Sequence, residues 1–395
     1  MGLFCSIIKP MKPKTLLFLI LNLVVLILLI ILFFPRNTKE EAPEENNTIT
    51  DEEISTRIGQ MIMIGFRGTE INPKITKLIK EVKPGGLILM DYDLPSKGQI
   101  PRNIVNPEQT KQLIKDLQLA SDTPLLIAVD AEGGLVNRLK PKYGFIDVPS
   151  AEKMGEGTPG DTKRIATELA KQLKNLGFNT NLAPVVDVNV DEASPAIGAL
   201  GRSFSSDPNL VIAHAREFIN AHKQESIITV LKHFPGHGSA GEDSHLELVD
   251  VTNTYQKEEL IPYQVLEADA VMTAHIMNKN EDPDYPATLS KIFLENILRN
   301  ELNFTGVIFS DDMQMAAIRD IYGFEKAIIK AVNAGNDIIL SSNNIEFNED
   351  EAYKIRDIIL EGAKNGKIPL SRIIESSDRI YNLKEKYNLG IIPGN

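Results

Sequence analysis

Cysteine is nearly absent from this chain, in which Cys5 is the single thiol among 395 residues. One cysteine excludes a framework of disulfides within the chain. Positive charge is also in short supply, because 42 lysines and arginines stand against 54 acidic residues and the formal net charge is −12. A surplus of negative charge repels a polyanion, so we expect no nucleic acid among the partners.

Several catalytic signatures are missing as well. The chain has no glycine-rich phosphate loop of the Walker type, no H-E-x-x-H zinc pair and no G-x-S-x-G serine elbow. Acyl transfer needs a nucleophilic serine or cysteine with a base, and neither is indicated here. What is present is the composition of an ordinary globular protein, with 43% hydrophobic and 24% charged residues.

One long hydrophobic run lies near the amino end. Residues 16–34 read LLFLILNLVVLILLIILFF and contain no charge. Nineteen residues are about what a helix needs to cross the ~30 Å hydrocarbon layer of a membrane. A cleaved signal peptide is the alternative, but its apolar core is shorter and ends at small residues. The run therefore predicts a transmembrane signal-anchor helix over residues 15–35.

The flanks of this run predict its orientation. Three lysines precede it and two basic residues follow it closely, and basic residues near a span stay on the cytoplasmic side. We expect a cytoplasmic segment at residues 1–14 and a single-pass cell-membrane protein with its catalytic domain outside the cytoplasm. Residues 36–50 are polar and acid-rich, which is typical of a flexible tether. Residues 51–395 then form one folded domain.

Eight short apolar runs recur in this domain, separated by segments with helical spacing such as residues 162–176 and 208–222. The runs are rich in Val, Ile and Leu with little alternation, which is typical of parallel strands buried on both faces. Eight such strands alternating with helices predict a single (β/α)8 TIM-type barrel. A doubly wound sheet is the alternative, but no glycine fingerprint follows the first strand. The expected strands are 61–66, 86–90, 125–129, 182–188, 227–232, 270–276, 306–311 and 337–340.

Six consecutive strands, from the second to the seventh, end in ionisable residues. A helix cap or a loop hydrogen bond would account for any one of them. In a barrel, however, all these strand ends point to one face, where the active sites of this fold lie. We therefore expect an active-site mouth at this face. The residues are Asp91, Asp130, Asp187, Lys232-His233, His275 and Asp311-Asp312.

The segment LKHFPGHGSAGEDSH, residues 231–245, carries three of the six histidines of the chain. A carboxylate at a strand end and an acid/base on a loop suit glycoside hydrolysis. Asp243 stands two residues before His245, where a carboxylate can orient an imidazole that donates and then removes a proton. The histidines and Asp243 could also bind a metal, but their spacing matches no common zinc site. We expect no metal and no cofactor.

Seven motifs occur together and in order, and they carry a family resemblance. They are DAEGGLVNRL, APVVDVN, GRSFSSDP, KHFPGHG…DSH, VMTAHI, PATLS and VIFSDDMQM. The set resembles the N-terminal barrel domain of glycoside hydrolase family 3, more narrowly its β-N-acetylglucosaminidase (β-N-acetylhexosaminidase) branch, over about residues 54–389. The resemblance implies a retaining exo-β-N-acetylglucosaminidase that removes terminal N-acetylglucosamine from peptidoglycan or muropeptides.

The resemblance also implies roles for individual residues. Asp311 is the nucleophile that forms a covalent glycosyl-enzyme, His245 is the general acid and then the base, and Asp243 orients His245. Five further residues bind the hydroxyls and the acetamido group of the sugar: Asp130, Arg138, Arg202, Lys232 and His233.

Alternatives to this interpretation remain at this point. Asp312 could be the nucleophile in place of Asp311. The chain could be a related family 3 β-glucosidase or β-xylosidase, or a non-catalytic protein that binds cell-wall sugars. Among the other histidines, we expect His237 to shape its loop, and His214 and His222 to lie on the surface. His275 is expected either in the core or at the sugar site.

Overall fold

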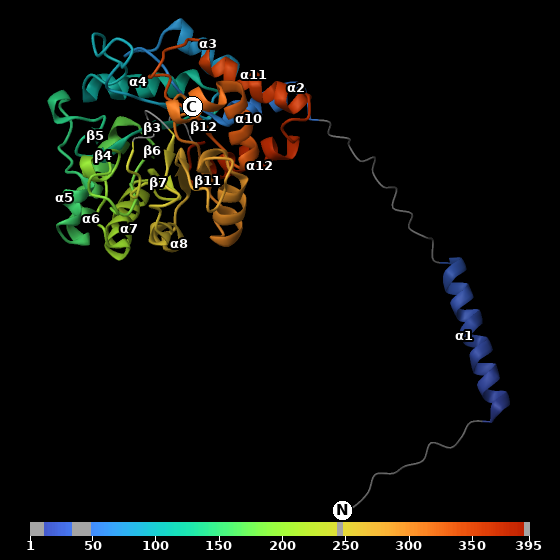
Figure 1. Cartoon of the computed structure of the whole chain (residues 1–395). Coiled ribbons are helices and arrows are strands. Elements are labelled where there is room, and N and C mark those ends of the chain that lie inside the picture. Colours follow the sequence, from blue (N-terminus) through green and yellow to red (C-terminus); the bar gives the residue numbers. More distant parts are fainter. Residues whose placement is uncertain (1–11, 34–48, 243–247, 391–395) are drawn as a thin grey trace, which may run out of the picture. The chain divides into compact units, whose positions relative to one another are not determined.

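The computed structural model describes residues 12–33, 49–242 and 248–390. The chain divides into two units, Met1–Ile49 and Thr50–Asn395. In the first unit, helix α1 (Pro13–Phe33) begins three residues before the hydrophobic run and includes most of it (Figure 1). Its first residues include Lys14 and Thr15, and the amide of Asn22 donates to the carbonyl oxygen of Phe18 at 2.7 Å.

The predicted transmembrane span is wrong. In the described part of the chain, no helix combines the length and the apolar character that crossing a membrane requires. The single-pass topology, the membrane as a partner and the localisation outside the cytoplasm all depend on that span, so these expectations are corrected with it.

In the second unit, eight parallel strands form one sheet in the order β11-β9-β7-β6-β3-β2-β1-β12. Its two ends meet, because Phe309 and Ile338 form a parallel bridge and the amide of Ser310 donates to the carbonyl oxygen of Ile338 at 2.8 Å. A closed sheet fits the predicted (β/α)8 barrel and excludes a doubly wound open sheet. The strands are β1 (Ile62–Gly65), β2 (Gly86–Ile88), β3 (Leu126–Val129), β6 (Thr180–Asn181), β7 (Ile228–Phe234), β9 (Ala270–Thr273), β11 (Val307–Phe309) and β12 (Ile339–Ser341).

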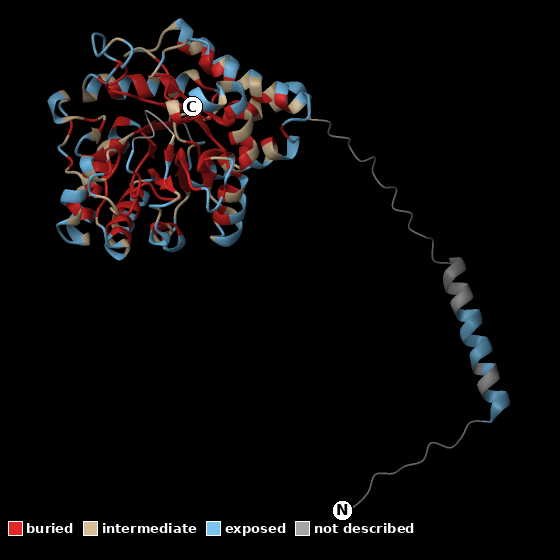
Figure 2. Ribbon diagram, in the orientation of Figure 1, coloured by how far each residue is buried: buried red, intermediate tan, exposed pale blue. Residues whose placement is uncertain are grey.

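Every residue of these eight strands is buried, as their continuous apolar character predicts (Figure 2). The bounds of all eight strands differ from the predicted ranges, and two strands differ most. The fourth was predicted over residues 182–188, but its regular part, β6, lies just before that range. Within the range Pro184 has no N–H to donate to the ladder, and a single bridge from Val185 to Lys232 remains. The sixth divides into β9 and β10 (Ile276–Met277), and β10 pairs with β8 (Val249–Asp250) outside the barrel.

Helices surround the barrel. Both helices named from the sequence form, as α6 (Pro159–Leu176) and α7 (Pro208–Gln224), and each has a proline in its first turn and a side-chain cap, from Thr158 and Asp207. The other helices are α2 (Asp51–Gln60), α3 (Pro73–Val82), α4 (Pro107–Ala120), α5 (Ala151–Gly155), α8 (Ile261–Val265), α9 (Ala316–Tyr322), α10 (Phe324–Ala334), α11 (Glu351–Lys364), α12 (Leu370–Lys386) and the π-helix η5 (Ile292–Glu301). Short 3-10 turns are η1 (Pro141–Tyr143), η2 (Gly198–Leu200), η3 (Lys257–Leu260) and η4 (Ala287–Leu289).

Two histidines of α7 are buried, and their predicted surface position is wrong. His214 lies 2.7 Å from the hydroxyl of Thr162 through Nδ1, and His222 lies 3.1 Å from the side-chain amide of Asn181 through Nε2. His222 also stacks on Phe218, with ring centroids 4.2 Å apart. Burial lowers the pKa of His222 to about 4. His214 therefore belongs to the packing between α7 and α6, and His222 to the packing between α7 and the barrel.

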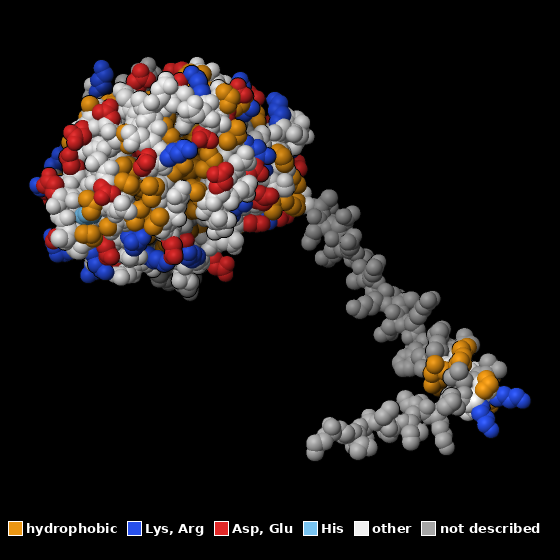
Figure 3. Space-filling model, turned by 60° about the horizontal axis from the view of Figure 1, so that its bottom comes forward, with side chains coloured by type: hydrophobic (Ala, Val, Ile, Leu, Met, Phe, Trp, Pro, Cys, Tyr) orange, Lys and Arg blue, Asp and Glu red, His pale blue; other side chains and the backbone are white. Residues whose placement is uncertain are grey.

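The surface shown in Figure 3 mixes acidic and basic side chains, with hydrophobic side chains between them. Interspersed charges of both signs are what an ordinary globular surface carries.

Candidate active site

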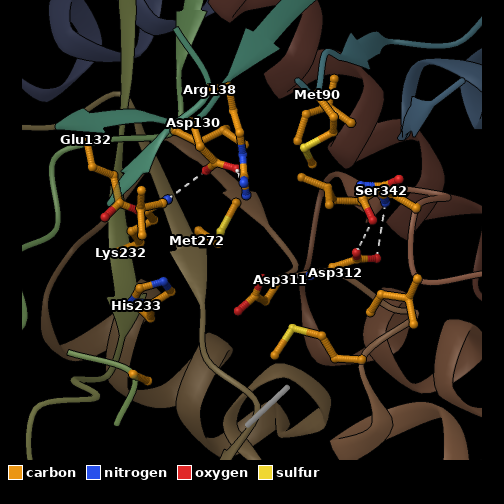
Figure 4. A pocket seen from close by; sticks show the side chains of 18 of the residues that line it. Met90, Asp130, Glu132, Arg138, Lys232, His233, Met272, Asp311, Asp312 and Ser342 are labelled. Atoms are coloured by element: carbon orange, nitrogen blue, oxygen red, sulfur yellow. Dashed lines mark hydrogen bonds and ion pairs between the residues drawn. The ribbon is translucent and has the colours of Figure 1, made fainter. Parts of the chain in front are cut away.

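A cavity of about 530 Å³ lies at the carboxyl ends of the barrel strands. All five residues predicted to bind the sugar line it, together with the predicted nucleophile (Figure 4). They are Asp130, Arg138, Arg202, Lys232, His233 and Asp311. The other two predicted catalytic residues, Asp243 and His245, lie outside the described residues. The structure thus brings together residues that are up to 181 positions apart in the sequence.

A hairpin positions the acidic wall of this cavity. Asp130 follows β3, and the chain then forms β4 (Ala131–Gly133) and β5 (Val136–Asn137), which places Glu132 and Arg138 on the same short hairpin. Its turn requires glycine at position 133, where φ is +108° and a Cβ atom would lie 2.1 Å from the carbonyl oxygen of Pro149. The glycine pair in the DAEGG motif is therefore a structural requirement of the hairpin.

Glu132 is the centre of a buried ion-pair network. Its carboxylate accepts two hydrogen bonds from Arg202, each of 2.8 Å, and lies 2.6 Å from the ammonium of Lys232. Lys232 also donates to Asp130 at 2.9 Å. The remaining guanidinium nitrogen of Arg202 donates to the carbonyl oxygen of Ala196 at 2.8 Å. Two cations and two carboxylates are therefore fixed in one wall.

The network keeps its carboxylates ionised. Burial opposes the charge on Glu132, but Arg202 and Lys232 outweigh burial and lower its pKa to about 2. The pKa of Asp130 is also lowered, because Lys232 and Arg138 outweigh its burial. The same attraction raises the pKa of Lys232 against its burial. All these groups remain charged near neutrality.

Arg138 keeps a hydrogen-bonding group available for a ligand. One of its terminal nitrogens lies 3.4 Å from Asp130, and Lys140 donates to Asp91 at 2.6 Å beside it. Within the described residues, the Nε atom of Arg138 is buried and has no hydrogen-bond partner. A polar group of a ligand bound in the cavity would satisfy this donor.

His233 is oriented from both of its ring nitrogens. Nδ1 lies 2.7 Å from the carboxylate of Asp187, and Nε2 lies 3.2 Å from a terminal nitrogen of Arg202. Because a guanidinium can only donate, Nε2 accepts and Nδ1 carries the proton that is donated to Asp187. Asp187 also accepts from the backbone amide of His237 at 2.9 Å, which fits the predicted loop-shaping position of His237.

Asp311 and Asp312 are adjacent but have different surroundings. In Figure 4, Asp311 points into the cavity toward the side of Lys232 and His233, whereas Asp312 points toward Ser342. One oxygen of Asp312 accepts from the backbone amides of Ser342 and Gln314, both at 3.1 Å, and the other from the hydroxyl of Ser342. Burial raises the pKa of Asp312 to about 6, against these hydrogen bonds.

The remaining strand-end residues lie behind the cavity wall. His275 is fully buried, with Nδ1 2.8 Å from the hydroxyl of Thr288 and Nε2 3.0 Å from the carbonyl oxygen of Asp312. The sequence left open whether His275 lies in the core or at the sugar site, and the structure places it in the core. Asp91 and Asp187 are buried too and hold Lys140 and His233. These three strand-end residues therefore do not bind a ligand directly but contact residues that line the cavity: Asp91 contacts Lys140, Asp187 contacts His233 and His275 contacts Asp312.

A buried carboxylate anchors the first part of the histidine-rich loop. Glu259, in turn η3, accepts from the backbone amides of Gly238 at 2.9 Å and Ser239 at 3.2 Å. Gly236 packs against it, since a Cβ atom there would lie 2.6 Å from that of Glu259. Burial raises the pKa of Glu259 to about 7, and the hydrogen bonds to Ser239 and Gln256 oppose the shift.

Glu132 and Glu259 are two residues of the site that the sequence alone did not indicate. Glu132 stands inside the quoted DAEGG motif, only two residues from Asp130, so the motif contained a signal for it. Glu259 follows the histidine-rich segment by 14 positions, and no local pattern links it to that loop. Among the described residues, no group of three or more His, Cys, Asp and Glu is arranged to hold a metal ion.

The charged side chains that line the cavity limit which ligands it can bind and which reactions it can support. A fixed set of charged donors and acceptors can hold a polyhydroxylated ligand by charge-assisted hydrogen bonds. A carboxylate on the facing wall, Asp311, is placed to act on a group held there. Such a cavity suits a reaction that develops positive charge on a bound ring.

Comparison with known proteins gives consistent results. Residues 53–383 match the family described as the glycosyl hydrolase family 3 N terminal domain. Proteins named β-hexosaminidase from Idiomarina loihiensis and from Xylella fastidiosa strain M23 are each 34% identical over 293 residues. These alignments cover 72% and 71% of this chain, and 84% and 82% of the two relatives.

Solved structures agree with these matches. A glycoside hydrolase family 3 β-N-acetylglucosaminidase from Paenibacillus sp. str. FPU-7 has a TM-score of 0.78 at 33% identity, covering 86% of this chain. This chain spans 64% of the length of that protein. A β-N-acetylhexosaminidase from Beutenbergia cavernae has a TM-score of 0.75 at 27% identity, covering 84% of this chain and 98% of that one.

Replacing Glu132 by Gln will destabilise the protein in a pH-dependent way. The folded pKa of Glu132 is lowered from 4.5 to about 2, so its stabilisation is complete above pH 4.5 and is lost as the pH falls toward 2. We expect the free energy of unfolding to fall by about 3 kcal/mol near neutrality. Urea unfolding followed between about pH 7 and pH 3 will show this difference shrinking as the pH is lowered.

The matched control is Glu156→Gln, which removes an exposed carboxylate that pairs with Lys153. This variant is expected to change the stability by less than about 1 kcal/mol. A difference between wild type and Glu132→Gln that stays constant over the whole pH range would contradict the account of Glu132 as an ionised centre.

Proposed function

The chain belongs to glycosyl hydrolase family 3 and is therefore a glycoside hydrolase, and from this premise we propose that it is a retaining exo-β-N-acetylglucosaminidase. The single observation that carries the proposal is the position of Asp311 across the cavity from the network of Glu132, Lys232 and Arg202. The names of the relatives and of the similar structures support the choice of sugar.

The proposed roles follow from the chemistry of the cavity. Asp130, Arg138, Lys232, Arg202 and His233 hold the hydroxyls and the acetamido group of a terminal N-acetylglucosamine. Asp130 and the three cations make charge-assisted hydrogen bonds, and their ion pairs fix these groups before the substrate arrives. Because little reorganisation is needed on binding, the binding energy is available to distort the sugar ring.

The first proposed step forms a covalent glycosyl-enzyme. A carboxylate oxygen of Asp311 attacks the anomeric carbon while the bond from that carbon to the glycosidic oxygen breaks. His245, oriented by Asp243, gives its proton to the departing oxygen, so that the leaving group departs as a neutral alcohol. The two residues take these roles from the motif alone, because both lie outside the described residues.

The second proposed step releases the sugar. His245 removes a proton from water, the water oxygen attacks the anomeric carbon, and the bond to Asp311 breaks. Two displacements at the same carbon retain the β configuration. Asp312 is not the nucleophile in this proposal, because three hydrogen bonds orient it toward Ser342 and Gln314.

Asp311→Asn is expected to abolish turnover of an aryl β-N-acetylglucosaminide, lowering kcat by at least about a thousandfold, because the amide is a poor nucleophile. Asp312→Asn is the matched control. Its amide oxygen can still accept from the amides of Ser342 and Gln314, so we expect most of the activity to remain. Nitrophenol release measures both variants. Equal losses in the two variants, with both proteins folded, would contradict the assignment of Asp311.

The sugar and the natural substrate are tested on a panel. Wild type is expected to hydrolyse the aryl β-N-acetylglucosaminide and not the aryl β-glucoside, because the acetamido group is part of the recognised substrate. We further propose peptidoglycan fragments as the substrate, and expect release of N-acetylglucosamine from a muropeptide with a terminal β-linked residue. Chromatography of the products measures this release. Turnover of the glucoside at a comparable rate would overturn the sugar assignment, and an inert muropeptide alone would overturn only the natural substrate.

A further inference from the structure

A second cavity, of about 570 Å³, lies at the other end of the barrel from the active-site cavity. Its walls come from η5, the end of α10, the turn before α12 and the first three turns of α12. Asp337 bonds to three of its lining arginines and also accepts from the backbone amide of Ile308, so the cavity is at the amino ends of β11 and β12. A volume of this size is typical of small-molecule sites.

The lining of this cavity is strongly cationic, in a chain whose net charge is −12. Five cationic side chains line it, against the two carboxylates Glu295 and Glu375. With Asp337 behind the wall, two positive charges remain in excess. The cations are Lys291, Arg299, Lys367, Arg372 and Arg379.

One buried carboxylate holds three guanidiniums together. Asp337 is fully buried and lies 2.6 Å from Arg299 and 3.1 Å from Arg379, and it also pairs with Arg372. The side chains of Arg299 and Arg372 are each only 14% exposed. Glu375 also pairs with Arg372 at 3.1 Å and with Arg379 at 3.8 Å, so the three guanidiniums meet two carboxylates. One positive charge remains in excess in this largely buried cluster, which therefore favours a further anion.

Two cationic side chains that line the cavity, Arg372 and Lys367, have N–H groups that could still donate to a ligand. Among the described residues, the Nε atom of Arg372 is buried without a hydrogen-bond partner, and Lys367 is exposed and forms no ion pair. Helix α12 also begins here at Leu370, and no side chain caps its first turn. The partial positive charge of a helix amino end adds to the attraction for an anion.

We propose that this cavity binds a small phosphorylated molecule, with its phosphoryl oxygens on Arg372, Arg379 and Lys367. The partly exposed guanidinium of Arg379 can match two oxygens of a phosphate group at once, Arg372 offers its unpartnered Nε, and Lys367 adds a point charge. The cavity is larger than a phosphate ion needs, so the ligand is a phosphate monoester with an organic part of about the size of a sugar. This proposal does not depend on the proposed glycosidase reaction.

The test is isothermal titration of the full chain with inorganic phosphate, a hexose 6-phosphate and the unphosphorylated hexose. We expect the hexose phosphate to bind at least as tightly as phosphate, with an affinity that falls as the salt concentration rises, and the hexose not to bind here. Lys367→Glu and Arg379→Gln are expected to weaken binding by about tenfold or more. Lys354→Glu is the matched control, because Lys354 is an exposed lysine on α11 outside the cavity.

Three results would overturn the proposal. The first is the absence of heat from either phosphate compound with folded wild-type protein. The second is binding that Lys367→Glu and Lys354→Glu weaken equally, because the anion would then respond only to the net charge of the protein. The third is binding of inorganic phosphate without binding of the hexose phosphate, which would show that the cavity does not accept the organic part.

Discussion

The active-site cavity depends on the ion pairs that Glu132 makes with Arg202 and Lys232. Taking these charges out of water is costly, and only their mutual attraction and complete hydrogen bonding make the arrangement stable. Arg202 comes from a loop and Lys232 from β7, whereas Glu132 lies on the β4–β5 hairpin. One carboxylate therefore joins three separate parts of the barrel mouth, and the positions of Asp130 and His233 follow from it.

This constraint explains why the cavity suits a sugar. The charged side chains of this wall are fixed before a ligand enters, because each of them forms a hydrogen bond to another charged side chain or to the backbone. A hydroxylated ring can then exchange its hydrogen bonds with water for hydrogen bonds with ionised groups, which are the stronger kind. Asp311 follows the end of β11 and faces this wall, whereas the carboxylate of its neighbour Asp312 accepts hydrogen bonds from Ser342 and Gln314. The two adjacent aspartates thus have different surroundings, which is why we propose the nucleophilic role for Asp311 alone.

Much of the fold and of the cavity could be predicted from the sequence. The apolar runs indicate the eight strands, and strand polarity alone brings Asp130, Lys232 and Asp311 to one face. The DAEGG motif marks the position of Glu132, but its partners are 70 and 100 positions away, so the ion pairs that it forms could not be predicted from the motif. His214 and His222 were placed on the wrong face, although the spacing of His222 from Phe218 puts both rings on the buried side of α7. The predicted membrane span came from hydropathy alone, and the described part of the chain contains no such helix.

The central claim, that a sugar held by the Glu132 network is attacked by Asp311, is tested most directly by trapping the glycosyl-enzyme. A fluorinated N-acetylglucosaminyl donor that glycosylates the protein quickly and hydrolyses slowly would be added, and the labelled peptide identified by mass spectrometry. The account predicts one sugar per chain, attached to Asp311. A label on Asp312 or Glu132, or no label on a protein that still turns over the aryl substrate, would contradict it.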